Sequence, residues 1–230
     1  MQAVNVTFVA VLAALFAAGS VRAQAEPYPS MAPLASYLMP EADEVALARS
    51  AAPKAISEAA DVMVLRKDGY ATVATGSNGF VCLVERGWGG DSTSVDFWNA
   101  RQRSPICFNA EAARTVVPIY LMRTRLVLQG KSKRESVQAT TAAIDSGQLP
   151  ALAPGAMCYM MSRQQYLGDE DKAWHPHLMF FVPGDAAKAW GANLPGSPVI
   201  AANDPEDRAT IMMMTVAHWS DGTPAPATHH

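Results

Sequence analysis

Two turn dipeptides, Asp68-Gly69 and Asn78-Gly79, divide an early stretch of the chain into three short apolar runs. Asp-Gly and Asn-Gly favour the positive-φ turns that join neighbouring antiparallel strands. The stretch therefore predicts a three-stranded meander over residues 62–65, 70–75 and 80–85. Apolar side chains occupy both odd and even positions of the third run, so we expect this strand to be buried on both faces.

The remainder of the chain mixes helix and strand signals. A helix is expected from residue 110, with Asn109 as its cap and Pro118 as a kink or a break. A second helix should begin at the capping box of Ser132 and Glu135. Further strands are expected at residues 157–162, 177–182, 199–202 and 210–218. The sequence thus predicts a single α+β domain, with a mainly antiparallel sheet of about six or seven strands and helices packed mainly on one face.

The first 25 residues have the composition of a secretory signal peptide. An apolar run over residues 4–18 is short for a membrane span, and Ala23-Gln24-Ala25 supplies the small residues that a signal peptidase requires. We expect cleavage after Ala25, or alternatively after Ala23, and export to the periplasm or the medium. No membrane span is expected in the exported chain.

The exported part divides by composition. Residues 26–40 contain Pro27, Pro29, Pro33 and Pro40 and predict an extended linker; residues 41–219 predict the domain, and residues 220–230 a flexible tail. The net charge of −3 becomes −4 when Arg22 leaves with the signal peptide. This acidic balance predicts no general affinity for nucleic acid.

Three cysteines follow the signal peptide: Cys82, Cys107 and Cys158. Export to an oxidising compartment favours one disulfide among them. We expect it between Cys82 and Cys107, because these residues flank a Gly- and Trp-rich loop that a cross-link would close. Cys158 lies in an apolar run and is expected to be a buried thiol.

The loop between the first two cysteines, residues 86–104, carries Trp88 and Trp98. Exposed tryptophans in a long loop suit stacking against a sugar or a peptide. The alternative is an aromatic lid over the edge of the core.

A histidine pair, His175 and His177, opens the expected strand at 177–182. Side chains two apart on a strand point the same way, so the pair could hold one metal ion, with zinc or copper as the candidates. The third ligand would come from His218, Cys158 or the acidic turn 169–171. We do not favour a metal, because no diagnostic ligand spacing is present. The alternative is that both histidines satisfy backbone or carboxylate groups at the start of the strand.

A thiol enzyme is a further alternative. Cys158 could pair with His175 or His177, with Asp169 or Asn193 orienting the imidazole. The apolar neighbours of Cys158 favour burial instead. The Gly-x-Ser-x-Gly and Ser-x-x-Lys motifs of serine hydrolases do not occur.

Three segments, Leu47-Ala48-Arg49-Ser50-Ala51-Ala52-Pro53, residues 78–84 and residues 176–181, resemble segments of exported bacterial proteins without an assigned function. The resemblance covers most of residues 41–219 and implies export but no activity. The sequence contains no complete catalytic constellation. It therefore favours an exported, non-enzymatic protein that binds a small ligand between the Trp88/Trp98 loop and the His175/His177 strand, with the metal protein and the thiol enzyme as alternatives.

Overall fold

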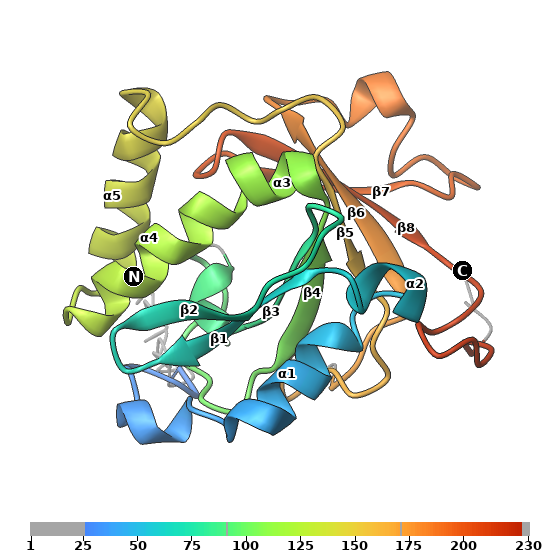
Figure 1. Ribbon diagram of the computed structural model, residues 1–230. Coiled ribbons are helices and arrows are strands. Elements are labelled where there is room, and N and C mark those ends of the chain that lie inside the picture. The colour runs from blue at the N-terminus through green and yellow to red at the C-terminus, as the bar shows by residue number, and fades with distance from the viewer. Residues whose placement is uncertain (1–25, 91, 171, 227–230) are drawn as a thin grey trace, which may run out of the picture.

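The computed structural model describes residues 26–90, 92–170 and 172–226, which form one eight-stranded sheet with helices against it (Figure 1). The predicted α+β class and the mainly antiparallel sheet are confirmed, and the sheet has one strand more than expected. The predicted signal peptide, residues 1–25, lies outside the described residues. Among the described helices, none combines the length and hydrophobicity that crossing a membrane requires.

The strands follow the sheet order β2-β1-β3-β4-β5-β6-β8-β7. Their bounds are β1 Asp61–Arg66, β2 Gly69–Ala74, β3 Val81–Glu85, β4 Ser104–Phe108, β5 Met157–Met160, β6 His177–Pro183, β7 Ile200–Asp204 and β8 Ala209–Thr215. The helices are α1 Glu41–Arg49, α2 Lys54–Ser57, α3 Ala110–Thr115, α4 Val117–Leu128 and α5 Lys133–Asp145, and the 3-10 turns are η1 Leu34–Ser36, η2 Gly87–Gly89 and η3 Lys188–Trp190.

The first hairpin of the predicted meander is confirmed. The third strand is present, but it does not pair as the meander predicts. β1 and β2 pair antiparallel around Asp68-Gly69, whereas β3 pairs with β1 in parallel. The segment around Asn78-Gly79 is a crossover rather than a hairpin turn. The amides of Ser77 and Asn78 donate to the carbonyl of Ala59 at 2.8 and 3.2 Å, which carries the chain across the start of β1. The strand that is apolar on both faces thereby lies inside the sheet.

The strand that the sequence pattern does not reveal is β4. It has only five residues and contains Pro105, a residue that is rare inside strands. β4 pairs antiparallel with the whole of β3, which places Cys107 opposite Cys82 and Ser104 opposite Glu85.

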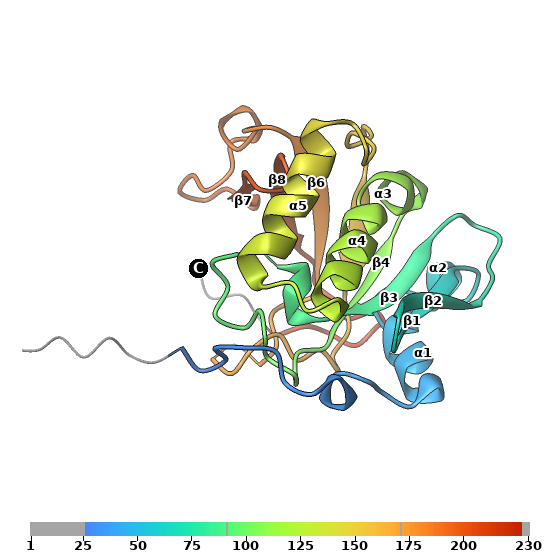
Figure 2. The same ribbon diagram turned by 90° about the vertical axis from the view of Figure 1, so that its left-hand side faces the viewer.

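The two longest helices, α4 and α5, lie with α3 on one face of the sheet, as expected, and α1 and α2 cover part of the other. Leu47 and Ala48 of α1 contact one face, which includes Cys82 and Val84 of β3. Residues of α3 and α4 pack on the opposite face, which includes Leu83. Figure 2 shows α1 and α2 on one side of β1–β3, with α3, α4 and α5 on the other.

The helix signals in the sequence are confirmed. The side chain of Asn109 accepts a hydrogen bond from the amide of Ala112 at 2.9 Å and caps α3. Pro118 stands in the first turn of α4, so the expected helix is split into α3 and α4. Ser132 and Glu135 form the predicted capping box at the start of α5.

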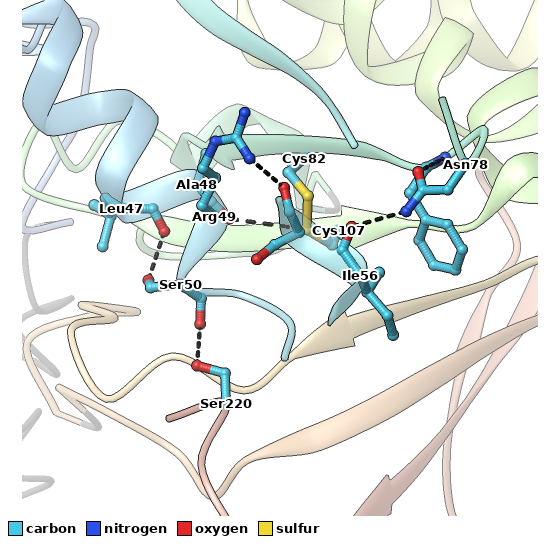
Figure 3. The surroundings of a disulfide bond; sticks show 11 residues. Leu47, Ala48, Arg49, Ser50, Ile56, Asn78, Cys82, Cys107 and Ser220 are labelled. Carbon is cyan, nitrogen blue, oxygen red and sulfur yellow. Dashed lines mark hydrogen bonds between the residues drawn. A yellow bond between two sulfur atoms is a disulfide. The ribbon is translucent and has the colours of Figure 1, made fainter. Parts of the chain in front are cut away.

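The predicted disulfide between Cys82 and Cys107 is present and joins β3 to β4 on the α1 face (Figure 3). Ser220 Oγ donates to the carbonyl of Ser50 at 2.5 Å nearby, so the C-terminal segment is bonded to the end of α1. Cys158 is a buried free thiol, as expected. A buried disulfide is compatible with an oxidising compartment.

The segments expected to be linker and tail are bound to the domain. Tyr37 is fully buried, and its hydroxyl donates to the carbonyl of Trp98 at 2.8 Å. The amide of Ala225 donates to the carbonyl of Ala217 at 2.8 Å. Residues 220–226 are therefore attached, which departs from the expected loose tail, while residues 227–230 lie outside the described part of the chain.

Candidate functional site

A cavity of about 330 Å³ lies between α4 and the sheet face that α4 covers. Most of its lining is apolar and comes from α4, strands β5–β8 and two loops: Val116, Ile119, Leu152, Met160, Leu167, Met179, Phe181, Ala202, Ala209 and Ile211. The volume is at the lower end of the range for small-molecule sites, which are typically apolar with a few polar groups. The cavity therefore has the size and lining of a site for one small molecule.

Polar side chains enter this cavity wall from three places. Glu85 and Ser104 come from directly paired positions of β3 and β4, and Gln102 precedes β4. Tyr120 comes from α4, and Asn203, Asp204 and Asp207 come from the end of β7 and the turn that follows it. The described residues that line the cavity include no Lys, Arg or His, so its charged wall groups are all carboxyls.

Glu85 is the most unusual of these groups. It is 9% exposed, and no described residue forms a hydrogen bond or an ion pair with its carboxyl group. Burial raises the pKa of Glu85 to about 8; nearby Asp207 adds to the rise and Arg123 opposes it. Desolvated carboxyls in cavities are typical of functional sites, because burying one without a partner costs stability.

Gly89 of η2 provides the space that Glu85 occupies. A Cβ atom at this position would overlap the end of the Glu85 side chain. The turn itself is held against α4, because Trp88 is buried and its Nε1 donates to Thr124 Oγ1 at 3.0 Å. The position of the Glu85 carboxyl therefore depends on a glycine in a firmly packed turn.

Arg123 joins the elements that frame the cavity. It is 2% exposed on α4, and its Nη2 donates to Asp207 Oδ1 at 2.5 Å and to Thr140 Oγ1 of α5 at 3.2 Å. Its Nη1 donates to the carbonyls of Gly89 and Gly90 at 3.1 and 3.2 Å. Burial raises the pKa of Asp207 to about 6, against the influence of Arg123. One guanidinium thus connects α4, α5, η2 and the β7–β8 turn.

The β7–β8 turn is also bonded directly to its neighbours. Glu206 accepts hydrogen bonds from the amide and the hydroxyl of Ser92, and its carbonyl accepts one from Thr141 Oγ1 at 2.9 Å. Arg208 forms a two-point ion pair with Asp145 of α5, at 2.8 and 2.7 Å. These bonds hold the acidic end of the cavity wall in place.

Trp88 and Trp98 are not exposed for stacking, which corrects the expectation of a ligand surface there. They are 1% and 8% exposed and lie in a cluster with Tyr37 and Phe97. The alternative of an aromatic lid over the core describes them correctly. Neither tryptophan belongs to the described lining of the cavity.

The histidine pair has a structural environment. His177 is 3% exposed, its Nδ1 lies 2.7 Å from the carbonyl of His175, and its ring centroid lies 4.6 Å from that of Trp174. Burial lowers the pKa of His177. Within the described ranges, no three His, Cys, Asp or Glu side chains are placed to hold a metal ion, so the predicted set of His175, His177 and His218 is not assembled. Neither His175 nor His177 lines the described cavity.

The residues proposed for a thiol enzyme do not form a hydrogen-bonded set in the part of the chain that the structure describes. Cys158 is fully buried, and burial raises its pKa well above that of an ordinary thiol, which disfavours the nucleophilic thiolate. Asp169 is at the surface, hydrogen bonded by Tyr28 Oη at 2.5 Å and paired with Arg101. Asn193 bonds the backbone of Ala201. Neither expected orienting residue therefore serves Cys158 or a histidine.

The sequence pattern does not indicate that Glu85, Tyr120 and Asp207 line a cavity, or that Arg123 lies behind its wall. One signal was available, because Glu85 ends a strand whose other side chains are apolar on both faces. A charged residue in a strand of that kind must pair with an opposite charge, be protonated, or bind a ligand. Tyr120 and Arg123 lie on the same helix, and they meet Asp207 only in the fold.

A search of protein-family models, of curated proteins and of solved structures found no match to this chain.

Proposed function

We propose that this is an exported, non-enzymatic protein that binds one small, mostly apolar molecule in the cavity between α4 and the sheet. The observation that carries the proposal is Glu85, an unpartnered carboxyl in an otherwise mainly apolar cavity. A chain of this size gains stability from filling its core, and a desolvated carboxyl opposes that gain. A ligand that uses the group explains why such a residue stands there.

Export is supported by two features. The first 25 residues have signal-peptide composition, and the disulfide between Cys82 and Cys107 suits an oxidising compartment.

Binding without turnover is favoured by the partners of the neighbouring groups. Acid-base catalysis on a bound molecule usually employs two groups with separate roles. Asp207, the other cavity carboxyl with a raised pKa, is engaged by Arg123. Cys158, the free thiol among the described residues, is buried with a raised pKa. Glu85 is therefore left as a recognition group.

The proposal is tested with N-phenyl-1-naphthylamine, an apolar dye whose fluorescence rises in a dry cavity. We expect saturable binding to the wild-type protein and a loss of affinity of about tenfold or more in Ala202→Trp, which places a large ring at the cavity wall. Ala201→Trp is the matched control, because adjacent residues of β7 face opposite sides of the sheet. Absence of saturable binding, or equal losses in the two variants, contradicts the proposal.

A further inference from the structure

We infer that the cavity selects a ligand with a basic amine, whose ammonium group pairs with the carboxylate of Glu85 while an apolar body fills the remaining space. This inference rests on the proposed function and deepens it by naming the class of ligand. Three observations support it: the negative sign of the charges on the cavity wall, the partners that those charges already have, and the acceptor atoms around Glu85.

The wall charges favour a cation. The charged groups lining the cavity are Glu85, Asp204 and Asp207, and no described lining residue carries a positive charge. Arg123 lies behind the wall and pairs with Asp207, so one carboxyl is already compensated. Glu85 has no such partner among the described residues. A ligand with a carboxylate or a phosphate would meet this acidic wall and be repelled.

The acceptor atoms near Glu85 suit an ammonium group, which has three hydrogen-bond donors. Ser104 stands opposite Glu85 across the β3–β4 pair and contributes a hydroxyl oxygen. That oxygen already accepts a hydrogen bond from Gln102 Nε2 at 3.1 Å, which leaves capacity for a second donor. Tyr120 brings a phenol to the same cavity from α4, and no described residue is hydrogen bonded to it. Carboxylate, hydroxyl and phenol oxygens thus occur together on the wall.

The apolar lining sets the rest of the ligand. A volume of about 330 Å³ suits one compact molecule rather than a long chain. Phe181, Met179 and Ile211 come from adjacent strands and form an apolar floor that suits an aromatic or branched aliphatic body. The expected ligand is therefore a small hydrophobic amine.

The proton balance of binding follows from the groups that face Glu85. Its pKa of about 8 reflects burial and the nearby Asp207, against Arg123 of α4. Glu85 in turn helps to raise the pKa values of Tyr120 on α4 and Cys158 on β5. At pH 7, below the pKa of about 8, the free cavity holds Glu85 largely protonated. Binding an ammonium ion then ionises Glu85, and one proton passes to the solvent for each amine bound.

The test compares three compounds that share a phenyl group and differ in their polar end: 2-phenylethylamine, 2-phenylethanol and 3-phenylpropanoate. Each competes with N-phenyl-1-naphthylamine at pH 8.5, where Glu85 is largely ionised. We expect the amine to bind about tenfold or more tightly than the alcohol, and the carboxylate to bind most weakly. Glu85→Gln keeps the shape of the side chain and removes its charge. In this variant the affinity for the amine should fall to that for the alcohol.

A second measurement uses only the wild-type protein, so it does not depend on the folding of the variant. Calorimetric titration of the amine at pH 7, in two buffers that differ in ionisation enthalpy, should show release of close to one proton, and the alcohol should show none. Equal affinity of amine and alcohol, an amine preference that survives Glu85→Gln, or the absence of proton release overturns the inference. If the wild-type protein still binds the dye in these experiments, the proposed function is supported even where the inference fails. If it binds no dye, both the proposed function and the inference are contradicted.

Discussion

The carboxyl group of Glu85 lies in the space that a Cβ atom on Gly89 would occupy. The two residues come from the end of β3 and from η2, and the turn cannot retreat easily because Trp88 is buried within it. A side chain at position 89 must therefore move the carboxyl rather than the backbone.

Gly89→Ala is expected to displace Glu85 and to weaken binding of 2-phenylethylamine about fivefold or more, with a stability cost of about 1–3 kcal/mol from overpacking. The matched control is Gly90→Ala, because a Cβ atom there meets its nearest neighbours at 3.4 and 3.8 Å, an ordinary contact distance. Competition binding and urea unfolding of both variants supply the measurements. Equal behaviour of the two alanine variants contradicts the role assigned to Gly89.

Glu85 should also make the stability of the protein depend on pH. Its folded-state pKa of about 8 exceeds the ordinary value, so the folded chain binds the proton more tightly than the unfolded chain. The free energy of unfolding is thus largest at low pH and falls as pH rises toward 8, by at most ~1.4 kcal/mol per pH unit for this one group. Asp207 acts in the same direction up to about pH 6.

Urea unfolding between pH 5 and pH 8.5 measures this dependence. Above pH 6, where Asp207 contributes little, Glu85→Gln should flatten the curve relative to the wild-type protein. Parallel curves for the two proteins across that range would show that Glu85 is not the titrating group.

Local features of the fold could be predicted because neighbouring residues determine them. Asn109 and the pair Ser132/Glu135 cap helices with side chains that bond amides within three residues. Asp68-Gly69 forms its hairpin for the same reason. The parallel pairing of β1 with β3 depends instead on hydrogen bonds to Ala59, which no local pattern indicates.

The candidate site could not be predicted from residue types alone. Histidines and tryptophans are the residue types that the sequence offers as site candidates. In the fold Trp88 is buried and bonds the hydroxyl of Thr124, and His177 is buried with its Nδ1 against the carbonyl of His175. The cavity depends on Arg123 and Asp207, which are separated by 84 positions and meet at 2.5 Å. Glu85, an acidic residue in an otherwise apolar strand, is the local sequence feature that indicates the cavity.

The three cysteines predict a simple count of reactive thiols. The native protein should react with a thiol reagent only very slowly, because Cys158 is fully buried and has a raised pKa. Denaturation without a reductant should expose one thiol per chain, and denaturation with a reductant should expose three. Colorimetric thiol titration makes the measurement. Fast labelling of the native protein would revive the thiol enzyme, and three thiols without reduction would contradict the disulfide.

Arg123 should be the costliest charged residue to replace at the cavity. Arg123→Met leaves Asp207 buried without its cation and removes donors from Thr140 and from the carbonyls of Gly89 and Gly90. Breaking a buried ion pair on one side costs about 3–5 kcal/mol. We expect the free energy of unfolding, measured with urea, to fall by that amount. Dye binding should also weaken, because the β7–β8 turn detaches.

The matched control for this variant is Arg125→Met, an exposed arginine of the same helix, which should change stability by about 0.5 kcal/mol or less. In Arg123→Met/Asp207→Asn the unpaired charge is also removed, so part of the stability should return. The size of that recovery separates the cost of the stranded carboxylate from the cost of the lost donors. If Asp207→Asn brings no recovery in the Arg123→Met background, the guanidinium acts on the cavity through the η2 carbonyls and Thr140 rather than through the ion pair.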